Sequence, residues 1–166
     1  MLVIDNFLPN DIWNEFKNGY IADIFRGYLP LYFVGAVASI NNTIDNNYYF
    51  EHNIFRKHEV VSNELYSYII AKIAPLLDVK SFIRIKLNAY PRMDNIIEHD
   101  SHIDYDFEHK GALLFLNTCN GFTRLEDGNK VDSVENKMMF FDPSKEHNSS
   151  TCTDEKLRVT INFNYF

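Results

Sequence analysis

Hydrophobic residues along this chain follow two different spacings, and the change falls near residue 80. Before it, two segments repeat apolar residues every three or four positions, which predicts amphipathic helices. The first follows Pro9 and Asn10, which favour a helix start, and the second begins near Ser62 and is disfavoured beyond Pro75. The apolar faces are formed by Ile12, Trp13, Phe16 and Tyr20 in the first helix and by Leu65, Tyr66, Ile69, Ile70 and Ile73 in the second. Each helix is therefore expected to pack on an apolar surface.

From Lys80 onward the spacing changes to two, which is typical of β-strands. The strand-like runs cover 83–90, 111–117, 138–141 and 158–165. Helices followed by several short strands predict an α+β chain. We expect a double-stranded β-helix (jelly-roll) core with the N-terminal helices packed on its major sheet. Residues 1–166 would form one domain, with a helical part over about 1–79 and a jelly-roll part over about 80–166.

The last strand-like run has two chemically different faces. Its apolar side is Val159, Ile161, Phe163 and Tyr165, and its polar side is Arg158, Thr160, Asn162 and Asn164. If the apolar side packs against the helices, Arg158 points into the jelly roll, where it favours a pocket over an ordinary core. The segment 28–50 is rich in Asn and aromatic residues and has no clear period, so we expect loops over that pocket.

Composition and charge narrow the classes of function. With 46% hydrophobic residues the chain is expected to fold, and its net charge of −7 makes a nucleic-acid partner unfavourable. No apolar run is long enough to span a bilayer. The opening MLVIDNFLPN lacks a secretion signal, which predicts a cytoplasmic protein with Cys119 and Cys152 as free thiols. Nothing in the sequence indicates an oligomeric state.

Three residues have the chemistry of a metal site. Two imidazoles and one carboxylate form the facial triad that binds non-haem Fe(II), and His102, Asp104 and His147 supply this set. A His two positions before an Asp is common by chance, but in a strand both side chains would project to one face. Asp106 would share that face and is the less favoured alternative ligand. Arg158 follows with a guanidinium that can bind a carboxylate in bidentate geometry.

This ordered set resembles the Fe(II) and 2-oxoglutarate dependent dioxygenase superfamily, close to its prolyl 4-hydroxylase-like branch and small phage-encoded members. The resemblance covers about residues 80 to 166 and extends to Tyr90, the Phe115, Leu116 and Asn117 step, and the ending RVTINFNYF. It implies that His102, Asp104 and His147 hold Fe(II) and that Arg158 binds the far carboxylate of 2-oxoglutarate. The family often has Tyr at the position of Phe115, so Tyr90 or Thr160 would have to help Arg158. A phage-encoded member would act in the host cytoplasm.

The resemblance implies hydroxylation with O₂ and release of succinate and CO₂, with ascorbate as an auxiliary reductant and no catalytic residue beyond the metal ligands. A peptidyl proline is the first substrate class and a small molecule the second. Asp104 disfavours the halogenating branch, which lacks this carboxylate, and Asn164 stands where nucleobase demethylases have a second Arg. The alternative is a non-catalytic, cupin-like jelly-roll protein that binds metal or has a structural role. Arg158 argues against it, because a plain metal binder needs no carboxylate anchor.

The remaining histidines are expected to lie outside the site. His99 alternates away from His102 in a regular strand and is assigned to the surface or to a supporting position, and His52, His58 and His109 are assigned to solvated loops. The family's glycine pair is replaced here by Gly121 and Phe122, which would reshape the mouth of the pocket.

Overall fold

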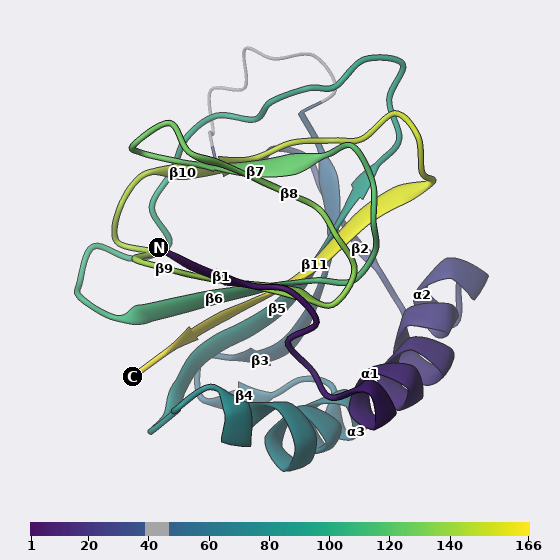
Figure 1. Ribbon diagram of the computed structural model, residues 1–166, viewed down its shortest axis with the longest axis vertical. Coiled ribbons are helices and arrows are strands. Elements are labelled where there is room, and N and C mark those ends of the chain that lie inside the picture. Colours follow the sequence, from purple (N-terminus) through teal and green to yellow (C-terminus); the bar gives the residue numbers. More distant parts are fainter. Residues whose placement is uncertain (39–46) are drawn as a thin grey trace.

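Two antiparallel β-sheets face each other in the computed structural model, which describes residues 1–38 and 47–166 (Figure 1). The major sheet has eight strands in the order β1-β9-β6-β11-β5-β3-β2, with β4 paired to β3. The minor sheet has three strands in the order β10-β7-β8. The predicted jelly-roll core is therefore confirmed. The loops predicted over residues 28–50 lie partly outside the described residues.

The longest strands of the major sheet are the three neighbours β11, β5 and β3. The strands of this sheet are β1 (Leu2–Ile4), β2 (Tyr32–Val34), β3 (Tyr49–Arg56), β4 (Glu59–Val60), β5 (Phe82–Pro91), β6 (Lys110–Phe115), β9 (Lys137–Phe141) and β11 (Leu157–Tyr165). The minor sheet consists of β7 (Phe122–Leu125), β8 (Lys130–Asp132) and β10 (His147–Ser149). The alternating runs at 83–90 and 158–165 thus became the neighbouring central strands β5 and β11.

Both predicted helices are present, and each contains a turn of π-helix. The first runs from α1 (Asn10–Phe16) through Lys17–Ile21 to α2 (Ala22–Arg26). The second runs from α3 (Asn63–Tyr68) through Ile69–Ile73 and ends in the 3₁₀ turn Ala74–Leu76, as Pro75 predicted. The first helix begins at Asn10, and no side-chain hydrogen bond caps it.

The main hydrophobic core lies between these helices and the outer face of the major sheet (Figure 1). Phe16 and Ile69 of the helices belong to it, together with Leu87 of β5 and Ile161 of β11, which stand opposite each other in the sheet. Strand alternation therefore turns the polar residues of β5 and β11 toward the minor sheet. This confirms the predicted orientation of the two faces of the last strand.

The predicted helical part, residues 1–79, also contributes β1, β2, β3 and β4 to the major sheet, so the division into a helical and a jelly-roll part needs correction. Strand β3 was missed because a bulge between Asn53 and Phe55 shifts its register against β5 and breaks the period of two. Strands β1 and β2 are too short, at three residues each, to show a period.

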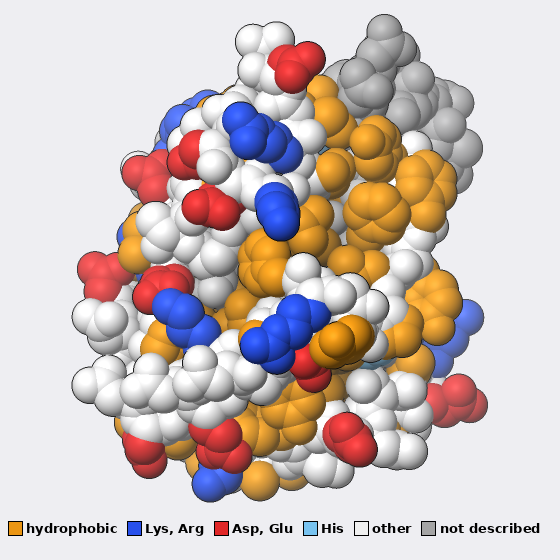
Figure 2. All heavy atoms as spheres, turned by 90° about the vertical axis from the view of Figure 1, so that its right-hand side faces the viewer, with side chains coloured by type: hydrophobic (Ala, Val, Ile, Leu, Met, Phe, Trp, Pro, Cys, Tyr) orange, Lys and Arg blue, Asp and Glu red, His pale blue; other side chains and the backbone are white. Residues whose placement is uncertain are grey.

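Hydrophobic side chains reach the surface on the side of the molecule where β2 and α2 lie (Figure 2). Tyr28, Tyr32 and Phe33 are largely exposed there. Strand β2 forms the edge of the major sheet, and Val34 from this strand lines a surface pocket. Within the described ranges, no helix has the length and apolar character needed to cross a membrane.

Candidate active site

His102, Asp104 and His147 meet between the two sheets. One donor atom from each lies within 4.8 Å of the others, and the imidazole ring centroids are 4.6 Å apart. The backbones of His102 and His147 exchange two hydrogen bonds of 2.9 Å, and the amide of Asp104 donates to the carbonyl of Pro143 at 2.9 Å. The structure thus brings together all three residues of the predicted triad.

The local structure around this pair differs from the prediction. His102 and Asp104 do not lie in a regular strand: between β5 and β6 the chain is irregular, and His102 forms an isolated bridge to His147. Their shared orientation comes from long-range backbone pairing rather than from strand alternation. Asp106 is exposed and outside the cluster, whereas Asp104 is inside it.

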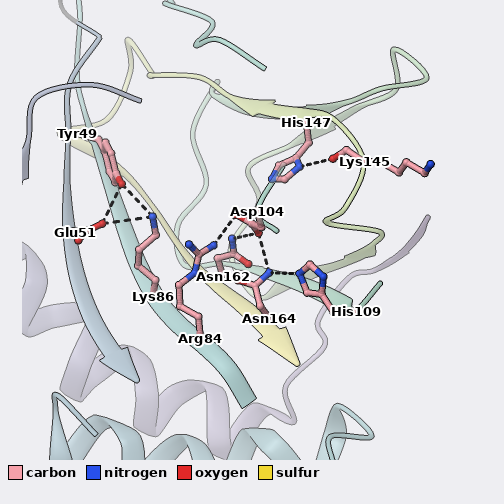
Figure 3. Close-up of polar contacts among 10 residues, drawn as sticks. All are labelled: Tyr49, Glu51, Arg84, Lys86, Asp104, His109, Lys145, His147, Asn162 and Asn164. Atoms are coloured by element: carbon pink, nitrogen blue, oxygen red, sulfur yellow. Dashed lines mark hydrogen bonds and ion pairs between the residues drawn. The ribbon is translucent and has the colours of Figure 1, made fainter. Parts of the chain in front are cut away.

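Hydrogen bonds fix the carboxylate of Asp104 from two sides (Figure 3). Nη2 of Arg84 donates to Oδ1 at 2.6 Å, and the side-chain amides of Asn162 and Asn164 donate to Oδ2 at 3.0 and 2.9 Å. Burial alone would raise the pKa of Asp104, but the Arg84 guanidinium, His147 and the two asparagine amides together outweigh burial and hold the pKa well below its usual range. Asp104 is therefore an oriented anion, as a metal ligand must be.

The two imidazoles are also prepared for a metal. Nδ1 of His147 donates to the carbonyl of Lys145 at 3.0 Å, so the neutral ring keeps its lone pair on Nε2 (Figure 3). Burial, followed by the proximity of His147, lowers the pKa of His102 to about 4. A neutral imidazole is the form that binds metal ions.

A cavity of about 190 Å³ connects this cluster with the predicted cosubstrate residues. Arg158 and Thr160 of β11 and Tyr90 of β5 line it together with His102, Asp104 and His147. Phe115 does not line the cavity; its ring packs near the Arg158 guanidinium, 5.7 Å from centroid to Cζ. The hydroxyl of Thr160 is buried, lacks a partner and faces the cavity, so it can bind a ligand where Phe115 cannot.

Arg158 is fully buried and lacks a carboxylate partner among the described residues. Its guanidinium donates to the carbonyl of Ser150 at 3.2 Å and to the hydroxyl of Thr123 at 2.7 Å, and it lies 5.3 Å from the ring centroid of Tyr90. Burial lowers the pKa of Arg158, yet a guanidinium stays charged in proteins. A buried cation without a counter-ion destabilises the folded state unless an anionic ligand pairs with it.

The donor set and the unpartnered atoms fit a metal and a polar ligand. Two imidazole nitrogens and one carboxylate oxygen are the ligands of a facial Fe(II) site. Among the described residues, several buried polar atoms of the cavity lining lack a partner, namely Asn88 Oδ1, His102 Nδ1, Arg158 Nε, Thr160 Oγ1 and Asn162 Oδ1. Buried polar groups are rarely left unsatisfied, so their concentration here points to a bound molecule.

Sequence reasoning missed several residues of the site. Tyr49, Arg84 and Lys86 line the cavity, and Arg84 and Lys86 lie on the polar side of a strand that was predicted. The rule that placed Arg158 in the interior applies equally to these two cations. Tyr49 could not be found in this way, because the bulge hides the period of β3.

Of the two places predicted for His99, the surface and a supporting position, its surroundings agree with the second: it is buried, with its ring centroid 5.3 Å from that of Tyr90. Two other histidines differ from the prediction. His52 is buried in β3, and His109 is buried beside Asn164, whose side-chain amide lies 3.2 Å from its Nε2. His58 is exposed, as expected. Cys119 and Cys152 are free and buried, as expected for reduced thiols.

This chain is similar to known proteins in its structure, whereas its sequence alone matches none of them. No protein-family model matches the chain, and no curated protein matches its sequence. A prolyl hydroxylase from Trichoplax adhaerens, solved with a hypoxia inducible factor peptide fragment, has a TM-score of 0.69 at 17% identity, covering 99% of this chain and 82% of the other. A prolyl-4-hydroxylase from Pseudomonas putida gives 0.62 at 17% identity, with 99% and 92% covered.

A third solved structure, an oxidoreductase of the 2OG-Fe(II) oxygenase family from Burkholderia pseudomallei, has a TM-score of 0.63 at 13% identity and covers 88% of this chain and 77% of the other. At these identities the likeness concerns the fold. The chain has the fold of prolyl-4-hydroxylase-like 2-oxoglutarate and Fe(II) oxygenases, in agreement with the resemblance of its sequence.

Proposed function

We propose that the chain is an Fe(II)- and 2-oxoglutarate-dependent dioxygenase that hydroxylates a peptidyl, first of all prolyl, or small-molecule substrate. The observation that carries this proposal is one cavity lined both by a two-histidine, one-carboxylate cluster and by the unpaired buried cation Arg158. The similarity to solved oxygenases supports the general kind of reaction. The similar prolyl hydroxylase from Trichoplax adhaerens was solved with a peptide fragment, which supports a peptide substrate for this chain.

His102, Asp104 and His147 would hold Fe(II), and Arg158 and Thr160 would hold the distal carboxylate of 2-oxoglutarate, with Tyr90 packed beside them. Bound Fe(II) and O₂ would supply the oxidising chemistry, with release of succinate and CO₂ and with ascorbate as an auxiliary reductant. The protein's own part is orientation. Arg84 and Asn162 hold the carboxylate of Asp104, and the cavity would place the metal ligands and the residues for the cosubstrate along one space.

The alternative is a non-catalytic jelly-roll metal protein. It would need the triad but would have no use for Arg158, whose burial without a counter-ion disfavours the folded state. That such an unfavourable cation lines the same cavity as the three proposed metal ligands supports a cosubstrate site. We also propose a cytoplasmic location, supported by the two buried free thiols.

Succinate release from 2-oxoglutarate with Fe(II) under air tests the proposal. We expect slow turnover by the wild type and loss of it in Asp104→Ala and Arg158→Met. The matched controls are Asp106→Ala and Arg26→Met, because both residues are exposed and outside the cavity. The proposal is refuted if the wild type neither binds Fe(II) nor consumes 2-oxoglutarate, or if the control variants lose activity to the same extent.

A further inference from the structure

A second group of charged residues lines the cavity beside the proposed metal ligands. Arg84 and Lys86 of β5 project from the same side of that strand, and Glu51 and Tyr49 of β3 lie next to Lys86 (Figure 3). The proposed roles of Fe(II) and 2-oxoglutarate use the triad and Arg158 but leave Lys86 without a task. The contacts of Lys86 therefore indicate what else the cavity can bind.

Lys86 is a partly buried cation, with 15% of its side chain exposed, and its ion pair is incomplete. Its Nζ donates to the hydroxyl of Tyr49 at 3.1 Å and lies 3.5 Å from Oε2 of Glu51, beyond the 2.7–2.9 Å of a strong charge-assisted hydrogen bond. Glu51 is already engaged: the Tyr49 hydroxyl donates to Oε2 at 3.0 Å, and the Asn53 amide donates to Oε1 at 2.7 Å. An ammonium has three N–H donors, so Lys86 keeps donor capacity for a ligand.

The charges around the cavity favour an anion. Arg84, Lys86 and Arg158 contribute three positive charges, whereas Asp104 and Glu51 contribute two negative charges. Under the proposed function, the two positive charges of Fe(II) balance the two carboxylates of 2-oxoglutarate. One positive charge is then left over. Arg158 would be paired with 2-oxoglutarate, and of the other two cations Lys86 lies farther from its carboxylate, at 3.5 Å, than Arg84 does, at 2.6 Å.

The geometry gives an anion a route to Lys86. A second pocket of about 310 Å³ shares Tyr49, Arg84 and Lys86 with the lining of the central cavity, so Lys86 is reached from both. Arg56 adds another cation to the wall of this second pocket. A substrate that occupies both pockets would pass Lys86 on its way to His102 and Asp104.

We propose that Lys86 binds a carboxylate of the substrate, which makes the substrate a carboxylic acid, either a free acid or a peptide with an acidic group next to the hydroxylated residue. Arg84 is less available to such a carboxylate, because its guanidinium is already engaged by Asp104 and by Asn164. This inference rests on the proposed function, because it assigns the remaining part of the same site. It places recognition of the substrate on β5 and recognition of the cosubstrate on β11.

Pairs of probes that differ only in one carboxylate test the proposal. Acetyl-L-proline is compared with acetyl-L-prolinamide for a free acid, and acetyl-Pro-Asp-amide with acetyl-Pro-Asn-amide for an acidic peptide. Binding is measured by NMR on protein loaded with Zn(II) and saturating 2-oxoglutarate, where no turnover occurs, and stimulation of succinate release is measured with Fe(II). We expect the acid of at least one pair to bind about tenfold or more tightly than its neutral partner. The pair that discriminates identifies the source of the carboxylate.

Two variants of opposite sign separate binding from a structural role. Lys86→Met should abolish the preference for the acid. Glu51→Gln should strengthen it several-fold, because it removes the competing carboxylate charge while its amide oxygen can still accept from Asn53. The control Lys72→Met removes an equal charge from an exposed position on the second helix and should change nothing. If Lys86 had only a structural role, neither variant would change the preference.

Failure of this inference is distinguishable from failure of the proposed function. Equal binding of acid and amide in both pairs overturns the inference, provided that the wild type still consumes 2-oxoglutarate. It is also overturned if Lys86→Met weakens the binding of 2-oxoglutarate and leaves the binding of the probes unchanged, since Lys86 would then anchor the cosubstrate. A wild type that shows neither 2-oxoglutarate binding nor turnover refutes the proposed function, and the inference with it.

Discussion

Gly121 gives Arg158 the space it occupies, and filling that space should damage the cosubstrate site. A Cβ added at Gly121 would lie 2.5 Å from Cδ of Arg158 and 2.6 Å from the carbonyl oxygen of Thr151. Carbon atoms in contact normally stand about 3.5–4.0 Å apart, so the overlap is about 1 Å or more. Both overlaps must be relieved in Gly121→Ala, so the Arg158 side chain must shift, and the backbone at Thr151 or at residue 121 must shift with it.

The size of the effect follows from that overlap. Overpacking of a buried site costs about 1–3 kcal/mol, and in a chain of this length each kcal/mol shifts the melting temperature by about 2–4 °C. A displaced guanidinium should lose a charge-assisted hydrogen bond to 2-oxoglutarate, worth about 1.5–3 kcal/mol. The expected result for Gly121→Ala is therefore a melting temperature lower by about 2–12 °C and 2-oxoglutarate binding weaker by at least tenfold.

The assay combines thermal unfolding with titration of 2-oxoglutarate into Zn(II)-loaded protein. Gly19→Ala is the matched control, because nothing lies within 4 Å of a Cβ at Gly19 and its φ is not positive. Gly19 lies within the first helix, where alanine should stabilise the protein by up to about 1 kcal/mol. The reasoning is refuted if Gly121→Ala melts and binds like the wild type, or if Gly19→Ala weakens 2-oxoglutarate to the same extent.

Three further predictions concern single groups in the cavity. Thr160→Val should raise the free energy of unfolding by about 1 kcal/mol, because it removes a buried hydroxyl without a partner among the described residues. It should also weaken the binding of 2-oxoglutarate several-fold. A variant that is less stable in urea unfolding would contradict this. Zn(II) should raise the melting temperature of the wild type but not of Asp104→Ala, since a ligand that binds only the folded state stabilises it; equal shifts would exclude Asp104 as a ligand. Burial and, after it, the charge of Arg84 lower the pKa of Lys86 to about 8, below that of a lysine in the unfolded chain. Above pH 8 the unfolded state therefore binds more protons than the folded state. The free energy of unfolding of the wild type, relative to that of Lys86→Met, should rise from pH 8 to pH 10. Urea unfolding of both proteins across that range measures it, and a constant difference would show that Lys86 titrates normally.

How far the fold could be predicted depended on the length and regularity of each strand. Strands β5 and β11 have ten and nine residues and one face on the helices, so their alternation was visible in the sequence. Strand β3 is nearly as long, but its bulge interrupts the alternation. Strands of two or three residues, such as β1 and β10, are held by pairing with distant partners and carry no period of their own.

The three residues predicted as metal ligands lie together in the structure, but not for the reason that the sequence suggested. Strand alternation was expected to align His102 with Asp104, whereas their positions depend on hydrogen bonds to His147 and Pro143, about 40 residues further along the chain. A contact of that range has no local signature in the sequence. Arg158 was placed correctly because β11 is a regular strand, and the same argument applied to β5 would have found Arg84 and Lys86.

Strand β11 divides stability and function between its two faces. Ile161 and Phe163 lie in the core against the helices, whereas Thr160 and Asn162 face the cavity, although all four are buried. Burial of the first pair stabilises the fold, while burial of the second pair leaves polar atoms without partners, which opposes it. The fold can retain such an interior because the outer core compensates for it, and a bound metal and cosubstrate would supply the missing partners. Side-chain truncation at Ile161 should therefore lower stability with or without ligand, whereas truncation at Thr160 should act mainly on the ligand-bound state.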